Sequence, residues 1–418
     1  MILDFSIGNY RSFSTIQTLN LRSTGIVSDV KEIDQNNIVE RDGQKILKTI
    51  GIYGPNGSGK SNLLQGIKLF RQLVESSLES EAIMDFAAEP FALTNKEMDN
   101  AGFFQIQLLI KDKKYRYGFT LGHVGTVQQE WLFGPADKNE TWYFKRSFGK
   151  IELNNQWFEE GTNGPIESLR ENTLFLTFVS AYNGPTSHSI RNFIVKNISF
   201  ENRENRTSAN RKGNRLAYDQ NASTNQLIKE GKTQLVLDWL ESAGLFYSDI
   251  ALREHSGDFN VVLLEKSMYD ANGKIIGKHK MDLDLNESAG TKKFYHYIGL
   301  LYQMFTEGGI LISDEIDNNF HPSLLQKFIR SFNDKTINKA GAQLLFTSHD
   351  TNLLQPNVLR RDQIYFTEKA ENEETRLYSL SDLKGIRNNA DFARQYLAGF
   401  YGALPMLNRY KGLSTDNL

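Results

Sequence analysis

The sequence predicts an α/β fold that is built from both ends of the chain. Residues 46–79 predict a short strand, a glycine-rich turn and a helix, because apolar residues recur at helical spacing after the turn. Residues 103–153 alternate aromatic and branched runs with polar turns, which indicates an antiparallel sheet. From residue 286 onward, short apolar runs alternate with helical segments, a pattern typical of buried strands in a mixed or parallel sheet.

The predicted elements follow in a simple order. Strands are expected at 2–7 and 16–22, and a third run, 46–53, leads into the glycine turn. Residues 165–255 are expected to be mostly helical, and residues 259–283 form a predicted hairpin. The remaining elements expected are a helix at about 290–305, a helix after Pro322, and strands at 310–313, 342–348, 363–368 and 375–380.

This order divides the chain into four segments. Residues 1–80 form the first part of the α/β domain, and residues 81–160 form an inserted antiparallel β subdomain. Residues 161–285 are expected to be a helical lobe with a mobile basic loop and the hairpin. Residues 286–418 complete the α/β domain, so the middle of the chain is an insertion.

Composition limits the function classes. The chain has 418 residues, no cysteine and a formal net charge of −2. Disulfides and thiolate metal sites are therefore excluded, and no bulk charge attracts nucleic acid. No apolar run approaches the roughly 18 residues of a membrane span, so no signal, anchor or membrane contact is predicted and a cytoplasmic location is expected.

The segment GPNGSGKS, residues 54–61, matches G-x-x-x-x-G-K-[ST] between a predicted strand and a predicted helix. Backbone N–H groups of such a loop surround phosphate oxygens, since glycine lets the backbone approach closely. Lys60 is expected to reach the β- and γ-phosphates and Ser61 to bind Mg²⁺; the bland alternative is a chance glycine turn. The residues expected to hold the triphosphate are Gly54, Pro55, Asn56, Gly57, Ser58, Gly59, Lys60, Ser61 and Asn62.

Two acids follow a predicted buried strand in GGILISDEID, residues 308–317. Asp314 is expected to hold Mg²⁺ through water, because this ion keeps much of its hydration shell. Glu315 is expected to accept a proton from an attacking water or to orient it, which indicates hydrolysis as well as binding. The alternative is an acidic cap between a strand and a helix.

Two further motifs allow a functional and a structural interpretation. His349 in LLFTSHD, residues 344–350, is expected to hydrogen-bond the γ-phosphate, although histidines at strand ends are often ordinary turn residues. Ser288 and Gly290 in NESAGTKKF, residues 286–294, begin a predicted helix. They form either a second anion site or a plain N-cap, and the residues alone favour neither.

The order of GPNGSGKSN, ESAGT, ILISDEID and TSHD resembles the ABC-type ATPase head of transporters, SMC and RecF-like proteins, in which the short ESAGT position is the signature. Further segments are similar to bacterial AAA-type, OLD-like ATPases without a nuclease tail. Such ATPases are often encoded in phage-defence loci, for example the PARIS, RloA-like and Septu-like systems. These segments are NYRSF at 9–13, YRYGF at 115–119, DEIDNNFHP at 314–322, LRRDQIYFTEK at 359–369 and YLAGFYGALP at 396–405.

The resemblance implies a nucleotide shared between two copies of the chain. In such proteins two heads pair head to tail, so Ser288 and Gly290 would act on the ATP of the other protomer in a dimer or larger ring. ATP and Mg²⁺ are the implied cofactors. ESAGT departs from the usual LSGGQ, and the glutamine loop has no clear position, because an alternating strand accounts for Gln105 and Gln107.

The expected function is a Mg²⁺-dependent ATPase whose ATP-driven association serves as sensor and scaffold in a bacterial anti-phage complex. A separate effector, such as a TOPRIM or HNH nuclease, and a phage-encoded trigger are the expected partners, because the chain has no H-E-x-x-H or G-x-S-x-G pattern of its own. The alternatives are a RecF-like or SMC-like repair ATPase that binds DNA, and a nucleotide-dependent regulator that does not hydrolyse ATP.

Several charged residues have a bland interpretation beside a functional one. His321 begins a helix or contacts the opposite nucleotide; Arg11 is a solvated turn residue or approaches the nucleotide. Residues 360–362 (Arg, Arg, Asp) form a charged turn or a partner surface. A polar loop with basic side chains is either solvated or binds DNA phosphates; its residues are Arg203, Arg206, Arg211, Lys212 and Arg215, interleaved with Glu201 and Glu204.

Overall fold

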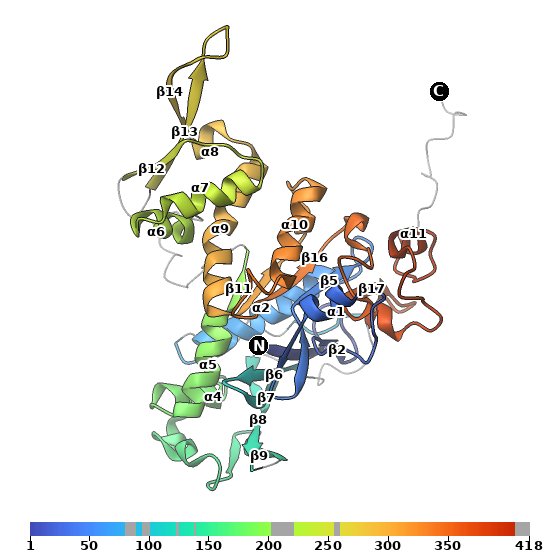
Figure 1. The fold of residues 1–418 in the computed structure, drawn as a ribbon. Helices are drawn as coiled ribbons and strands as arrows, with labels where there is room; N and C mark the ends of the chain where they lie inside the picture. Colours follow the sequence, from blue (N-terminus) through green and yellow to red (C-terminus); the bar gives the residue numbers. More distant parts are fainter. Residues whose placement is uncertain are drawn as a thin grey trace, which may run out of the picture.

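The computed structural model describes residues 1–79, 89–93, 101–122, 125–137, 139–201, 221–254 and 260–405. These residues form two large β-sheets with helices between and around them, and a small lobe that projects from one side (Figure 1). The predicted α/β class is therefore confirmed. No helix in the described part of the chain is long and apolar enough to cross a membrane.

A six-stranded sheet joins the two ends of the chain. All of its neighbouring strands are parallel except the last pair, and three central strands are completely buried, as expected for a sheet covered on both faces. In spatial order its strands are β11 (Ile198–Phe200), β15 (Ile310–Ser313), β16 (Gln343–Thr347), β5 (Thr49–Tyr53), β17 (Ile364–Lys369) and β18 (Thr375–Ser379).

A seven-stranded antiparallel sheet contains the segment expected as an insertion, together with the first two strands of the chain. The two strands predicted near the N-terminus, β1 and β2, pair antiparallel with each other. On its other side β1 pairs with β6, so the seven strands form one continuous sheet. In spatial order the strands are β10 (Lys150–Leu153), β9 (Asn139–Ser147), β8 (Val127–Ala136), β7 (Lys113–Leu121), β6 (Gly102–Ile110), β1 (Ile2–Gly8) and β2 (Gln17–Asn20).

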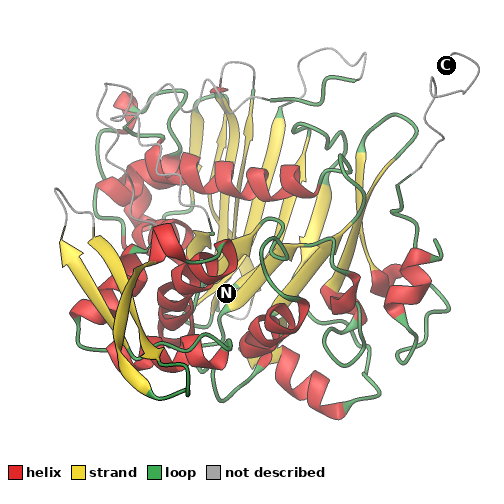
Figure 2. Cartoon of the chain, turned by 90° about the horizontal axis from the view of Figure 1, so that it is seen from above, coloured by secondary structure: helices red, strands yellow, loops and turns green. Residues whose placement is uncertain are grey.

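Helix α2 (Lys60–Ser76) lies against both sheets. Its residue Phe70 stacks on Phe119 of β7 at a centroid distance of 5.2 Å, and the same buried cluster includes Ile50 and Ile52 of β5. Figure 2 shows the strands side by side with helices against them. Helices α4 (Phe175–Ala181) and α5 (Pro185–Asn197) extend this first core.

A second core covers the opposite face of the six-stranded sheet and continues into the projecting lobe. It buries β16 and β17 residues such as Phe346 and Phe366 against helices and turns from the last third of the chain. The helices on this side are α1 (Lys31–Asn37), α6 (Ala222–Lys229), α7 (Thr233–Ser242), α8 (Leu283–Asn286), α9 (Ala289–Glu307), α10 (Pro322–Asn333) and α11 (Phe392–Leu397). The lobe adds a sheet of β12 (Asp249–Glu254), β13 (Asn260–Tyr269) and β14 (Ile275–Asp282).

Two expectations about the elements need correction. The run 46–53 is not one strand: it divides at Lys48, so β4 (Gln44–Leu47) pairs with β3 (Ile38–Arg41) while β5 enters the six-stranded sheet. The Lys48 side chain turns inward and donates to the carbonyl oxygen of Asn333 at 3.2 Å. In the segment 165–255, expected to be mostly helical, β11 and β12 are strands because their partners β15 and β13 lie elsewhere in the sequence.

Candidate functional site

The phosphate loop connects β5 to α2 as predicted. Gly54, Gly57 and Gly59 have φ angles of 150°, 77° and 108°, a region that glycine enters without strain. The first amide that donates within α2 is that of Leu63, to the carbonyl of Gly59 at 3.1 Å. The amides of Lys60, Ser61 and Asn62 therefore have no helical acceptor and, with the helix dipole, form an anion-binding helix start.

Lys60 is folded back onto the loop that it is expected to serve. Its Nζ donates to the carbonyl oxygens of Gly54 and Pro55 at 2.7 and 3.1 Å, and the side chain is buried. Burial lowers the pKa of Lys60, while the carboxylates that follow β15 oppose this shift by stabilising the ammonium form. Phosphate oxygens would replace the two carbonyl acceptors when a nucleotide binds.

The hairpin of β17 and β18 holds the phosphate loop from outside. Ser58 Oγ and Thr367 Oγ1 share a hydrogen bond of 2.6 Å, and Thr375 Oγ1 donates to the carbonyl of Ser58 at 2.9 Å. A Cβ atom on Gly54 or Gly59 would overlap these threonines, so both glycines are required by the close approach. Sequence reasoning missed Thr367 and Thr375, which lie more than 300 positions from the loop.

The N-terminal turn reaches the same place. Ser12 Oγ accepts from Asn62 Nδ2 at 2.8 Å and lies 2.8 Å from Thr375 Oγ1. The first turn of α2 is therefore fixed to the first and the last parts of the chain. Ser12 lies in NYRSF, next to Arg11, and no local pattern marks it as a contact of the phosphate loop.

Asp314 and Glu315 follow β15 at the carboxyl edge of the sheet, two strands from the phosphate loop. Strand β16 lies between β15 and β5, and Thr347 is its last residue. Its Oγ1 donates to Asp314 Oδ1 at 2.5 Å and accepts from the Glu315 amide at 2.7 Å. Glu315 has a φ of 50°, so its backbone turns sharply and the two acids take different directions. Thr347 is a positioning residue that sequence reasoning missed, although it stands two places before His349.

The carboxylate of Glu315 lies at the surface of the site. Its Oε2 accepts from Asn318 Nδ2 at 2.6 Å, and both side chains are exposed. The carboxylate is therefore accessible to water, as a general base requires. Asp314 is also exposed, with Oδ2 open beside the Thr347 contact.

The segment around His349, which follows β16, is joined to the loop that follows β15. The His349 amide donates to the carboxylate of Asp317, with N···O distances of 3.3 and 3.4 Å to its two oxygens. The His349 ring is exposed, and none of the described residues forms a hydrogen bond with it. Its backbone is anchored to DEID while its imidazole stays available for a ligand.

A magnesium site of the expected kind fits these residues. Ser61 and Asp314 supply two exposed oxygen atoms, and triphosphate oxygens and water would supply the rest, which suits a small hard cation. Within the described part of the chain, no group of three or more His, Asp and Glu side chains gathers into a protein-only cation cage. Mg²⁺ bound together with the nucleotide would neutralise charge on the phosphates.

Ser288 and Gly290 lie at the start of α9. Among the described residues, no hydrogen bond joins them to the phosphate loop. Ser288 Oγ accepts from the Thr291 amide at 3.2 Å, so the N-cap interpretation is confirmed. A Cβ on Gly290 would lie 2.5 Å from the carbonyl oxygen of Asn319. The start of α9 is thereby pressed against the loop that follows Glu315.

Lys293 strengthens this contact. Its Nζ donates to the carbonyls of Ile316 and Asn318 at 3.2 and 2.9 Å and forms an ion pair of 3.2 Å with Glu201. Two hydrogen bonds from Lys293 thus join the start of α9 to the DEID loop. Neither Lys293 nor this role of Glu201 was among the predicted features.

The remaining candidates have structural roles in this fold. His321 caps α10 by accepting from the Ser323 amide at 3.3 Å, which confirms the helix-start interpretation. Arg11 forms an ion pair with Glu89 at 2.6 Å in the turn. Gln105 accepts a hydrogen bond from Trp131 of the neighbouring part of the sheet and Gln107 accepts one from Arg22, so both side chains have structural partners.

The charged turn at 360–362 is not a partner surface. Arg360 and Asp362 are both 2% exposed and pair with each other at 2.9 Å, and Arg360 also pairs with Asp34. Arg361, between them, is half-buried and donates to the carbonyl oxygen of Ile386. The five basic residues considered for DNA binding, from Arg203 to Arg215, lie outside the described residues.

Solved structures with a related arrangement are heads of SMC proteins. The SMC head domain from Thermotoga maritima has 13% identity and a TM-score of 0.41, covering 90% of this chain and 98% of that one. An Smc head domain from Pyrococcus furiosus, bound to the C-terminal domain of ScpA, has 12% identity, a TM-score of 0.44 and coverage of 96% and 99%. An Smc head domain from Pyrococcus yayanosii has 10% identity, a TM-score of 0.42 and the same coverage. All three likenesses are distant.

No curated protein sequence matches the chain. A family match, in contrast, spans residues 50–355, from β5 through the phosphate loop, Asp314, Glu315 and His349. The chain is therefore a P-loop ATPase domain that belongs to the family described as "AAA domain, putative AbiEii toxin, Type IV TA system".

Proposed function

We propose that this protein hydrolyses ATP with Mg²⁺ in a site completed by a second copy of the chain, and that the ATP-driven association controls a separate effector in bacterial anti-phage defence. The observation that carries the catalytic part is the Thr347 hydroxyl, which bridges Asp314 and the backbone of Glu315. Two acids in fixed, different directions suit metal binding by one and water activation by the other.

The phosphate loop supports binding of the triphosphate. Lys60 and the amides at the start of α2 offer one positive charge and several donors to phosphate oxygens. Glu315 accepts the proton of the attacking water, while His349 and Lys60 stabilise charge on the γ-phosphate. ATP and water give ADP and phosphate, and Glu315 returns the proton to solvent, so no further reactant is needed.

The second copy enters the proposal through α9. Its start presents Ser288 and Gly290 at the surface, and Gly290 and Lys293 tie it to the DEID loop of the same chain. A nucleotide bound by the partner's phosphate loop against this helix start would therefore act on the loop that carries Glu315. ATP then serves as the adhesive of the pair, and hydrolysis releases it.

Mixing two inactive variants tests the shared site. Lys60→Met removes the phosphate-loop charge, and Ser288→Arg blocks the signature; each alone should abolish phosphate release. Mixed in equal amounts, they form heterodimers with one intact composite site, which should restore roughly a quarter of the wild-type rate. Ser242→Arg, an exposed serine on α7, is the matched control and should leave the rate unchanged.

If the mixture stays inactive while each variant still binds its partner, the site is not shared. If wild type and Glu315→Gln release phosphate at the same rate, the hydrolysis proposal is wrong. The defence role rests on the motif resemblance and is tested separately, by plaque counts on cells that carry the gene with its neighbours. Lys60→Met should remove any protection that the wild type provides.

A further inference from the structure

The hairpin of β13 and β14 extends beyond the rest of the lobe (Figure 1). β12 pairs with β13 only from Asn260 to Glu265, so the outer part of the hairpin is a bare two-stranded ribbon. Asp270 closes its turn by accepting from the amides of Asn272 and Lys274, each at 2.9 Å. The ribbon is therefore a defined element with a rigid tip.

The tip is apolar where no folding contact requires it. Four side chains near the turn are Met268, Tyr269, Ile275 and Ile276, exposed by 44%, 61%, 58% and 61%. Successive residues of a strand face opposite sides, so Ile275 and Ile276 make both faces of the tip apolar. A ribbon that is apolar on both faces suits insertion into a pocket better than contact with a flat surface.

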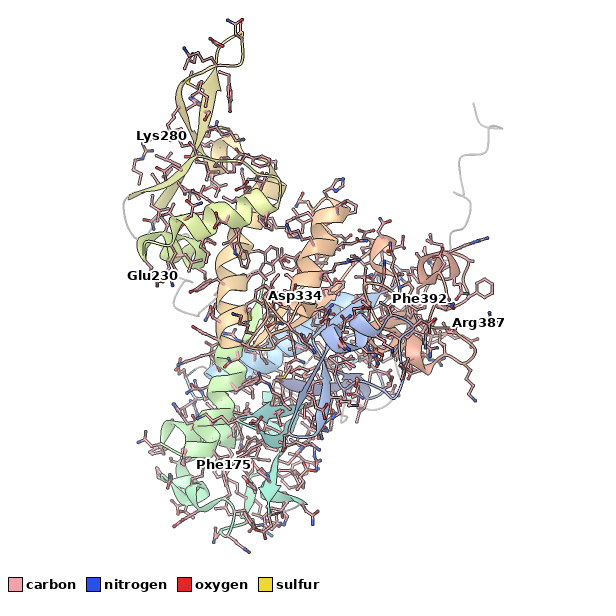
Figure 3. The ribbon with its side chains drawn as sticks, viewed as in Figure 1. Phe175, Glu230, Lys280, Asp334, Arg387 and Phe392 are labelled. Carbon is pink, nitrogen blue, oxygen red and sulfur yellow. The ribbon has the colours of Figure 1, made fainter. Side chains whose placement is uncertain are left out.

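Positive charge borders this tip. Of the nearby acids, Glu265 is neutralised by Lys278 at 2.7 Å, and the Asp270 carboxylate is used in the turn. Lys274 and Lys280 have no ion-pair partner among the described residues. Figure 3, which labels Lys280, shows it on the hairpin and clear of the two large sheets.

We propose that the hairpin tip, Met268, Tyr269, Ile275 and Ile276, is a docking surface for a partner protein that presents an apolar pocket bordered by Asp and Glu. Lys278 and Lys280 lie on the free edge of β14, and lysines on an edge oppose strand addition by a second copy. Three of the four tip residues are aliphatic, whereas binding of single-stranded nucleic acid depends on aromatic stacking. The aliphatic pocket filler with a basic border fits an acidic protein surface.

The docking surface connects to the signature through one strand. Lys266 of β13 pairs with Glu287 at 3.4 Å and lies 4.6 Å from the centroid of the Tyr247 ring. Glu287 is the first residue of ESAGT, so a partner held by the ribbon acts next to the ATP-binding helix start. The inference rests on the proposed function only in naming the effector as the docked partner.

The chain has no cysteine, so Tyr269→Cys creates a single thiol at the tip. We would label it with a photoreactive maleimide and add, one at a time, the purified products of the genes that flank its own. The expected result is a cross-link to one of them, mapped to a peptide rich in Asp or Glu. Binding of that product is then measured by interferometry on unlabelled variants.

Ile275→Ser with Ile276→Ser should weaken binding about 30-fold, since a tip anchor is removed from its pocket. Lys274→Glu with Lys280→Glu should weaken it about 5-fold, and more at low salt. Phe148→Ser changes an apolar residue between β9 and β10 that is even more exposed, at 76%; this control should bind normally. Equal melting temperatures show that the variants are folded.

The proposal is overturned if no flanking product is captured, or if both hairpin variants bind like the wild type. It is also overturned if the tip instead binds a second copy, seen by light scattering, or a duplex oligonucleotide, seen by anisotropy. Phosphate release is recorded for every variant. A wild type without ATPase activity whose capture still depends on the tip refutes the proposed function alone, whereas normal hydrolysis with tip-independent capture refutes the docking surface alone.

Discussion

Two buried lysines stand at opposite ends of β5. Lys48 precedes the strand and is 3% exposed, and Lys60 follows the phosphate loop and is 6% exposed. Both donate to backbone carbonyls, and burial lowers the pKa of both. Judged by burial and hydrogen bonding alone, they are nearly equivalent.

Their electrostatic surroundings separate them. The acids Asp314, Glu315 and Asp317 follow the parallel strand β15, two strands away from β5, and favour the charged form of Lys60. At the amino ends of the strands, burial and the like charge of Lys335 lower the pKa of Lys48 to about 8. The carboxylate of Asp334 opposes this shift only in part. The acids at the carboxyl edge thus help to keep Lys60 charged, whereas at the amino edge burial and Lys335 make the charge of Lys48 a cost to stability.

The largest effect expected at the carboxyl edge is on hydrolysis. Glu315→Gln should lower the rate of phosphate release by about 10²–10⁴-fold, because a general base is lost while its shape is kept. ATP affinity should stay within a few-fold of the wild type. The control is Asp334→Asn at the amino edge, and similar losses from both changes would remove the distinction between the two edges.

The lysine pair gives a direct comparison of nucleotide binding. Lys60→Met should weaken binding of a fluorescent ATP analogue by roughly 10–100-fold, since charged hydrogen bonds to phosphate are lost. Lys48→Met makes the same chemical change at the other end of β5 and should leave the affinity unchanged. Fluorescence titration of both variants with the analogue measures the two affinities. An equal loss of affinity in both would mean that Lys48 acts on the phosphate loop.

Stability should respond in the opposite sense. Lys48→Met should raise the free energy of unfolding at pH 7 by about 1–3 kcal/mol, because a buried charge is replaced by a methylene chain. The pKa of Lys48 is about 8 when folded against 10.5 in an open chain, so the native state loses this proton first. The charged Lys48 therefore lowers the stability of the wild type by its full amount below pH 8, and this penalty decreases between pH 8 and 10.5.

Urea unfolding at several pH values measures this difference. The gap between the variant and the wild type should narrow as pH rises through that window. A gap that widens with pH would contradict the assigned shift. Asp334→Asn in the wild-type background should lower stability slightly, since the opposing carboxylate is removed.

The smallest effect concerns the threonines that hold the loop. Thr375→Val should weaken ATP binding about 2–10-fold, because one buried hydroxyl bond to the Ser58 carbonyl is lost. Thr49→Val is the matched change at the amino end of β5, where Thr49 Oγ1 donates to Asn333 Oδ1 at 3.2 Å. Thr49→Val should reduce the melting temperature without changing the affinity for ATP. A Thr375 variant with normal affinity would show that the hydrogen bond from Thr375 to the phosphate loop is not needed for binding.

Local patterns explain what could be predicted of the site. The segment GPNGSGKS sits between a strand and a helix, and DE follows an apolar run, so both could be found within windows of about a dozen residues. Thr347, Thr367, Thr375 and Ser12 could not be found in this way. Their roles depend on which strands become neighbours, and a threonine at a strand end has no distinguishing local pattern.

Periodicity and glycine spacing are local properties of the chain, so the α/β class, the phosphate loop and the acids of the candidate site could be predicted without a structure. Three features became known only from the folded chain: β1 and β2 complete the seven-stranded sheet, 46–53 divides at Lys48, and Lys60 is the buried lysine near the acids. Gln343 shows the reason, because its side chain hydrogen-bonds to the backbone of Ile2 and Leu47, which are 341 and 296 positions away in the sequence. Such pairings depend on packing between distant segments, which no single window of sequence contains.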